Sequence, residues 1–161
     1  MKLSITRYHL IQCLLAAIVI TLIILVGETF SNNVVNAAIG SSVALVFLYP
    51  SNPQNKFRSL VLGNVVAILS FIVLNFLFSL FNQDLAITIF NKDFHFFVGV
   101  TFFLCIFIMS ITNTEHIPAA GTSIGLSIHT LDYALIIFIF FSVTILYVIK
   151  VVIDKYGINL F

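Results

Sequence analysis

The sequence predicts an all-α membrane protein with four long transmembrane helices, two short discontinuous half-helix segments and a 3+3 inverted repeat. Composition is the first reason, because 61% of the 161 residues are hydrophobic and only 8% are charged, whereas soluble domains carry about 25% charged residues. The second reason is a set of four long apolar runs, and the third is a pair of shorter segments that resemble each other. We expect a single transmembrane domain over residues 1–161.

Four segments have the length and apolar content of full membrane spans. Each holds roughly the 17–25 residues that cross a hydrocarbon core of about 30 Å. They are Leu10–Gly27, Ser59–Phe81, Phe94–Ile111 and Tyr133–Ile153. A basic N-terminus before an apolar run is also found in signal peptides, but no A-x-A-like cleavage site follows here. We therefore expect a retained first helix.

The two shorter segments are residues 34–49 and 114–130. Sixteen residues of α-helix rise only about 24 Å, which is less than the thickness of the core. Such a segment crosses if its first part is extended, at about 3.3 Å per residue, and otherwise it dips in and returns. In both cases non-helical backbone at membrane depth requires cover from protein or from a wet cavity.

The two short segments share a pattern of small and polar residues, since Asn36–Ser42 (N-A-A-I-G-S-S) parallels Pro118–Ser123 (P-A-A-G-T-S). Each lies between two long spans, which divides the chain into halves at 8–81 and 94–153. With three crossings per half, the second half begins on the opposite side of the membrane from the first. That is an inverted repeat, an architecture that places a substrate site near the midplane between discontinuous helices.

The basic residues lie at the edges of the apolar runs and predict the orientation. With six crossings, all but one lie on the side of the termini; these are Lys2, Arg7, Lys56, Arg58, Lys150 and Lys155, with Lys92 on the other side. The positive-inside rule therefore favours six crossings of the cell membrane with both termini cytoplasmic. No basic cluster is large enough for nucleic acid.

A substrate site is predicted where each short segment opens a half-helix. Pro118 suits a first helical turn because its missing N–H would be unpaired there. Two helix N-termini that face each other near the midplane would each offer about half a positive charge and free N–H donors, and so bind an anion without a basic side chain. The alternative is that the small residues only permit close helix packing. The expected binding residues are Asn36, Gly40, Ser41, Ser42, His116, Pro118, Ala119, Ala120, Gly121, Thr122 and Ser123.

Several polar residues lie near this region and have more than one interpretation. His116 contacts the substrate or sits at the cytoplasmic mouth, and Glu115 lies at the mouth or carries a proton. Asn64 and Asn75 share a helical face and either hold helices together or line a pathway. His129 and Asp132 are expected in a polar turn at the outer surface. The residues expected along the pathway or its entrance are Arg58, Asn64, Asn75 and Glu115.

The chain carries no pattern typical of an enzyme. It lacks an H-E-x-x-H, a G-x-S-x-G, a Gly-rich phosphate loop and a metal-ligand set. Cys13 and Cys105 lie singly inside apolar runs and are expected to act as small hydrophobic residues. We expect no cofactor and no metal.

Two runs of residues resemble a known family. The run His116–Ser123 (H-I-P-A-A-G-T-S) resembles the His-Pro-Pro signature of the HPP family of small membrane proteins, with Ile117 in place of the first proline. The run Gly40–Pro53, followed by Arg58–Asn64, resembles that family's Gly-Ser…Pro-x-x-Pro…Pro-Arg-Asn…Gly-His block, with Asn64 where a histidine is usual. The resemblance covers roughly residues 10–153.

The resemblance implies transport of nitrite, a small planar anion, across a membrane. Some members of the family carry a regulatory CBS domain after the spans, which we do not expect here. Uptake of one anion against an inside-negative potential costs about 2.3 kcal/mol per 100 mV, so it would need a proton carried by His116 or Glu115. Export or passive conduction would not. We expect a homo-oligomeric carrier or channel for a small monovalent anion; the alternative is a non-transporting membrane scaffold or partner-binding subunit.

Overall fold

The computed structural model describes residues 7–30, 33–81, 94–128 and 131–156. Within these ranges the regular secondary structure is helical throughout, which confirms the predicted all-α class. The α-helices are α1 Arg7–Gly27, α2 Asn33–Leu48, α3 Phe57–Phe81, α5 Phe94–Thr112, α6 Ile117–Ser127 and α7 Tyr133–Tyr156. Two short 3₁₀ helices, η1 Glu28–Phe30 and η2 Pro53–Asn55, follow α1 and precede α3. Lys2, Lys92 and His129 lie outside the described residues.

Four of these helices, α1, α3, α5 and α7, are long and apolar enough to cross a membrane. They coincide with the four predicted spans, within three residues at each end that the structure describes. α7 begins at a cap, because the Asp132 carboxylate accepts hydrogen bonds from the backbone N–H groups of Ala134 (2.8 Å) and Leu135 (3.4 Å). Asp132 thus forms the polar turn that the sequence predicts at this point.

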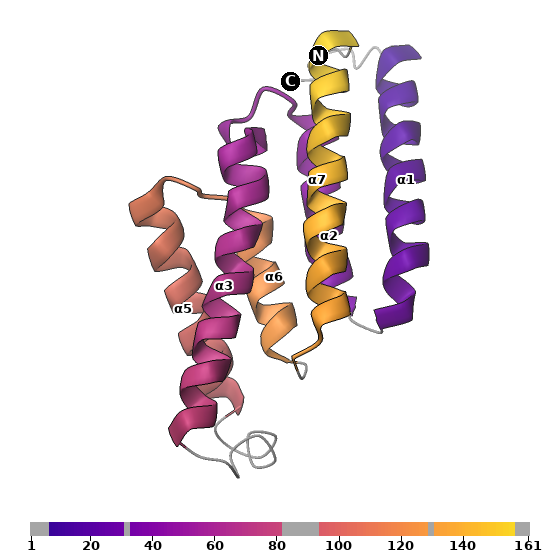
Figure 1. Cartoon of the computed structure of the whole chain (residues 1–161). Helices are drawn as coiled ribbons and strands as arrows, with labels where there is room; N and C mark the ends of the chain where they lie inside the picture. Colours follow the sequence, from indigo (N-terminus) through magenta and orange to yellow (C-terminus); the bar gives the residue numbers. More distant parts are fainter. Residues whose placement is uncertain (1–6, 31–32, 82–93, 129–130, 157–161) are drawn as a thin grey trace.

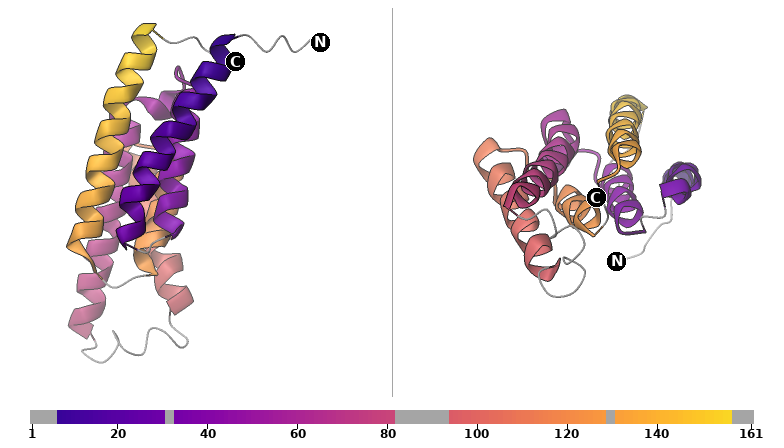
Figure 2. Two further views of the ribbon diagram at one scale, coloured as in Figure 1. Left: turned by 90° about the vertical axis from the view of Figure 1, so that its right-hand side faces the viewer. Right: turned by 60° about the horizontal axis from the view of Figure 1, so that its bottom comes forward.

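Successive helices alternate in direction, and α1 begins at the same end of the bundle where α7 ends (Figure 1). In a view closer to the bundle axis, α2 and α6 lie in the middle, with α3 and α5 on one side and α1 and α7 on the other (Figure 2). The second half of the chain therefore starts at the opposite end from the first, as an inverted repeat requires. The symmetry of the two halves stays a prediction.

The central pair, α2 and α6, packs closely because the residues between them are small. A Cβ added to Gly125 would lie 2.7 Å from Val35 Cγ2 and 2.9 Å from Val35 N, and one added to Gly121 would lie 3.4 Å from Ala38 Cβ. The spacing of Gly121 and Gly125 is the G-x-x-x-G pattern that allows membrane helices to approach. The packing interpretation of the small residues therefore holds at these positions.

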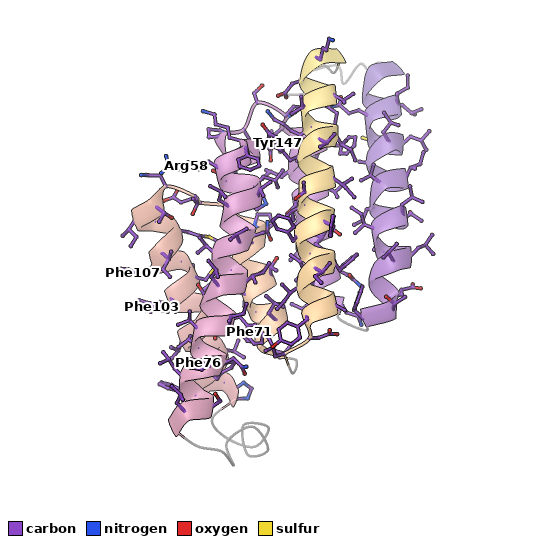
Figure 3. All side chains as sticks on the ribbon, viewed as in Figure 1. Arg58, Phe71, Phe76, Phe103, Phe107 and Tyr147 are labelled. Atoms are coloured by element: carbon purple, nitrogen blue, oxygen red, sulfur yellow. The ribbon has the colours of Figure 1, made fainter. Side chains whose placement is uncertain are left out.

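Apolar clusters fill the bundle on both sides of this contact. One cluster gathers where α2 and α7 begin, and its most buried members are Val35, Ile39, Phe71, Leu126 and Ile139. The other lies where α2 ends and α3 begins, and contains Val43, Val46, Phe47, Leu60 and Leu146. Other phenylalanines, including Phe76, Phe103 and Phe107, point away from the bundle (Figure 3) and suit a lipid environment.

One prediction about the helix starts is wrong. α2 is helical from Asn33 onward, so Asn36 and Gly40–Ser42 lie inside a continuous helix. No proline interrupts this segment, and a continuous helix satisfies the backbone groups of its interior in a low-dielectric surrounding. Because α2 and α6 run antiparallel, their N-termini lie at opposite ends of the pair and do not face each other. α6 does begin at the predicted place, with Pro118 in its first turn.

Candidate functional site

The turn between α5 and α6 sets the position of His116. α5 ends at Thr112, and Asn113 adopts the left-handed conformation (φ 51°) that asparagine tolerates better than most residues. The N–H of Thr114 then donates to the carbonyl of Met109 (3.0 Å), which completes a Schellman cap. Arg58 of α3 donates to the carbonyl of Thr112 (2.5 Å), so the turn is also tied to a second helix.

Gly63 allows the following residues to lie directly on α3. A Cβ at this position would lie 2.7 Å from the carbonyl oxygen of Thr114 and 3.0 Å from His116 Cβ. Because glycine has no side chain, the extended backbone at His116 (φ −142°) fits against the helix. As a result the His116 side chain is 1% exposed.

Both ring nitrogens of His116 have hydrogen-bond partners. Nδ1 lies 3.1 Å from the backbone oxygen of Gln54, and because a carbonyl only accepts, Nδ1 carries the hydrogen. Nε2 lies 3.0 Å from Ser42 Oγ of α2. The same hydroxyl lies 3.3 Å from the carbonyl of Ala38. Ser42 can therefore donate to a neutral ring, or accept from a protonated ring and turn its own hydrogen to Ala38.

Gln54 also occupies the N-terminus of α6. Its side-chain oxygen Oε1 accepts a hydrogen bond from the N–H of Ile117 (3.1 Å). Pro118 has no N–H, and the N–H of Ala119 donates to the His116 carbonyl (3.0 Å). The neutral carboxamide oxygen of Gln54 thus occupies a position at the positive end of α6. An anionic oxygen would be stabilised at the same position.

The loop that carries Gln54 is held by two asparagines. Asn52 caps η2, since its Oδ1 accepts from the N–H of Gln54 (2.9 Å). Asn55 is fully buried, and its Nδ2 donates to the carbonyls of Leu45 (3.0 Å) and Tyr49 (2.7 Å) at the end of α2. These bonds fix the distance between the end of α2 and the start of α6. Sequence patterns do not single out Gln54, because its role depends on a loop that meets a helix 63 residues later.

Asn64 of α3 continues the polar contacts one turn into α6. Thr122 Oγ1 donates to Asn64 Oδ1 (3.1 Å), and Asn64 Nδ2 donates to the carbonyl of Leu60 (2.8 Å). Both side chains are 1% exposed. Asn64 therefore joins two helices, as the first of its two sequence interpretations expects. We call these neighbouring polar residues the polar layer; its members are Ser42, Gln54, Asn64, His116 and Thr122. They form two hydrogen-bonded groups, one around His116 and one between Asn64 and Thr122.

Most other predicted binding residues lie outside the polar layer. Gly40 faces α1, where an added Cβ would lie 3.3 Å from Ile20 Cδ1. Asn36 packs against Gly27, and Ser41 is exposed and donates to the carbonyl of Ala37 (3.0 Å). On α6, the buried residues Ala119, Ala120 and Ser123 occupy helix contacts.

The predicted pathway residues are divided between the site and the surface. Asn64 is in the polar layer, whereas Asn75 is half-buried three turns further along α3. Arg58 and Glu115 are both exposed at the end of the bundle where α6 begins. Among the described residues, no three His, Cys, Asp or Glu side chains are arranged to hold a metal ion.

Four long apolar helices and a polar layer whose Ser42, Asn64, His116 and Thr122 side chains are buried define an integral membrane protein that spans the bilayer several times. The chain belongs to the HPP family, since residues 2–158 match the family's transmembrane region. This confirms the family that the motifs around His116 and Gly40 indicate. Comparison with curated proteins and with solved structures gave no match.

Proposed function

We propose that the protein carries a small monovalent anion, with nitrite as the first candidate, through the polar layer. Membership of the HPP family supports a role in membrane transport. The observation that carries the proposal is the Gln54 side-chain oxygen on the N–H of Ile117. That oxygen lies at the positive end of α6, next to the buried His116. An oxygen of the anion can take its position, because the N–H of Ile117 is already available there as the donor.

Binding begins when the Gln54 carboxamide turns away. The anion then accepts the hydrogen bond of Ile117, the residue after His116, while His116 Nδ1 keeps its contact with the backbone oxygen of Gln54. A negative charge at this place favours the protonated imidazole. Ser42 accommodates that proton because its hydroxyl has the Ala38 carbonyl as a second partner. One proton therefore accompanies one anion, and the step moves no net charge across the potential.

Access follows from the residues at the start of α6. The exposed Arg58 guanidinium attracts anions to the turn between α5 and α6, within reach of the Gln54 loop. Glu115 is exposed in the same turn. We propose that this end of the bundle faces the cytoplasm, because Lys56, Arg58, Lys150 and Lys155 all lie there. Labelling of single cysteines from each side tests the orientation.

We also propose that the protein works as a homo-oligomer. α1 packs mainly on α2 and leaves most of its surface outward, so this surface is available for contact with a second chain. Light scattering of the purified protein measures the number of chains. A monomer that retains full transport contradicts this part of the proposal.

The alternative, a non-transporting scaffold, has one observation in its favour. The side chains of the polar layer all have partners within the protein, and Gly121 and Gly125 pack α6 on α2. Flux into proteoliposomes separates the two functions. We expect nitrite to enter above the rate of empty vesicles, with nitrate, formate and chloride as comparison anions under a clamped potential. The absence of flux for all four anions would refute the transport proposal.

A further inference from the structure

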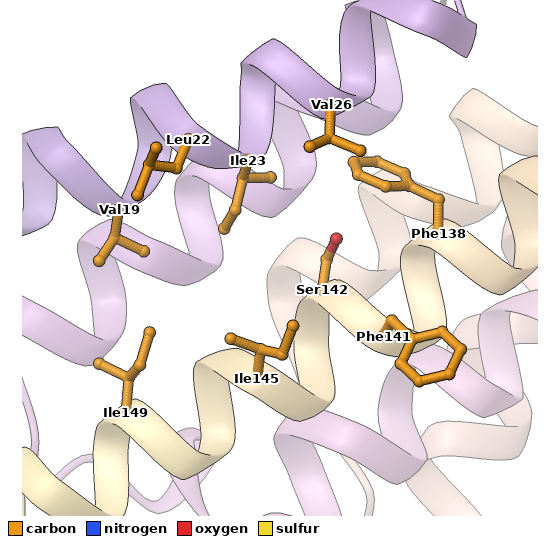
Figure 4. A pocket seen from close by; sticks show the side chains of 9 residues that line it. All are labelled: Val19, Leu22, Ile23, Val26, Phe138, Phe141, Ser142, Ile145 and Ile149. Atoms are coloured by element: carbon orange, nitrogen blue, oxygen red, sulfur yellow. The ribbon is translucent and has the colours of Figure 1, made fainter.

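An apolar groove of about 290 Å³ lies between α1 and α7 (Figure 4). Side chains of both helices point into it, and Ser142 is the one polar residue among them. The lining residues are Val19, Leu22, Ile23, Val26, Phe138, Phe141, Ser142, Ile145 and Ile149. From Phe138 to Ile149 the groove follows α7 for about 16 Å at 1.5 Å per residue. That length is close to one leaflet of the hydrocarbon core, about 15 Å.

A polar pocket of about 270 Å³ lies at the end of α7, against the loop between α2 and α3. It contains two lysines, Lys56 from the loop and Lys150 from α7. Lys150 is paired with Asp154, and its side chain is only 14% exposed, so its ammonium group is held in place. Lys56 is exposed and has no ion-pair partner among the described residues. The pocket therefore has a net positive charge at the polar edge of the bundle.

The groove and the pocket follow each other along α7. Ile149 lines the groove, and Ile153, one turn later, lines the pocket. Both isoleucines pack on the apolar cluster at the end of α2. We call the two cavities together the slot; its groove is apolar, and its pocket, one helical turn further along α7, is cationic.

We propose that this slot binds one anionic glycerophospholipid, with an acyl chain in the groove and the phosphate between Lys56 and Lys150. The groove and the bilayer interior are equally apolar, so the chain gains packing contacts but no hydrophobic transfer energy. Selectivity must therefore come from the headgroup. One lysine near a membrane surface contributes about a fivefold change in the affinity for an anionic lipid.

Native mass spectrometry of the full-length protein tests the proposal, with phosphatidylglycerol and phosphatidylcholine of the same acyl chains as probes. We expect phosphatidylglycerol to be retained at least about fivefold more. Lys56→Gln removes most of this preference. Lys155→Gln is the matched control, because Lys155 carries the same charge at the same end of α7 but does not line the pocket. It leaves the preference unchanged.

The groove is tested separately by Val19→Trp, which fills it from α1 without changing any charge. We expect retention of both lipids to fall, because both place an acyl chain in the groove. Equal retention of the two lipids by the native chain would overturn the proposal. So would equal losses for Lys56→Gln and Lys155→Gln, which would indicate attraction by the surface as a whole.

Discussion

Gly63→Ala changes the site without removing any polar group. The added Cβ would lie 2.7 Å from the Thr114 oxygen, whereas an ordinary C···O contact is about 3.3 Å. The turn before α6 must therefore move by about 0.6 Å. A movement of this size disturbs the hydrogen bonds of His116 to Ser42 and Gln54, which measure 3.0 and 3.1 Å.

The cost follows from these displacements. Overpacking of this kind costs about 1–3 kcal/mol, and each disturbed hydrogen bond adds about 1 kcal/mol. Alanine in place of glycine inside a helix stabilises that helix by about 1 kcal/mol, which offsets part of this cost. We therefore expect a net destabilisation of about 2–4 kcal/mol.

Thermal unfolding of the purified protein in detergent measures the change in stability, and nitrite flux measures the change in function. Gly99→Ala is the control, because an added Cβ at Gly99 of α5 meets nothing within 4 Å. That variant should be as stable as the native chain or slightly more stable. If Gly63→Ala matches Gly99→Ala in both stability and flux, the contact between α3 and the site does not have the role described.

Three further predictions address single contacts. Ser42→Ala leaves His116 Nε2 without its partner and should cost about 1–3 kcal/mol of stability and most of the flux. Ser41→Ala, at the adjacent exposed position, should change neither quantity. Equal effects of the two variants would refute the role given to the contact between Ser42 and His116. Asp132→Ala removes the cap of α7 and should lower stability by about 1 kcal/mol with unchanged flux, so an unaltered melting temperature would contradict it. Arg58→Ala should slow nitrite flux about threefold at low ionic strength and less at high salt, and a loss independent of salt would argue against attraction at the mouth.

The long spans could be predicted from the sequence because hydropathy alone sets them. Leu10–Gly27 and the other three runs are long and apolar, and a bilayer allows such runs little choice except helix. The start of α6 was also predictable, since proline suits the first turn of a helix better than its interior. Similarly, the amide of Asn64 in an apolar run indicates a contact with another helix.

The start of α2 could not be inferred in the same way. Small residues such as Gly40 and Ser42 indicate that something approaches closely, but not whether it is a ligand or another helix. In the structure Ser42 meets His116 at the start of α6, whereas Gly40 meets Ile20 of α1. The antiparallel packing that decides this is a long-range property of the fold.

The residue at the centre of the site was also beyond the sequence patterns. Gln54 lies in a loop without periodicity, and its contact with Ile117 depends on Asn52 and Asn55 holding that loop at the end of α2. A similar case is Gln12 of α1, whose Nε2 donates to the carbonyl of Phe47 (2.7 Å). In both cases a glutamine satisfies a helix end on another segment, which no local pattern reveals.

Gln54→Glu tests the central claim most directly. A carboxylate oxygen at the N–H of Ile117 places a permanent anion at the start of α6, and this should leave the fold intact or stabilise it by about 0.3–1 kcal/mol. Asn52→Asp adds the same charge to the same loop and keeps the oxygen that caps η2, so it serves as the matched control. We predict that the Gln54→Glu variant is folded but transports no nitrite, whereas the control retains flux. Full nitrite flux through Gln54→Glu would contradict an anion site at this helix end.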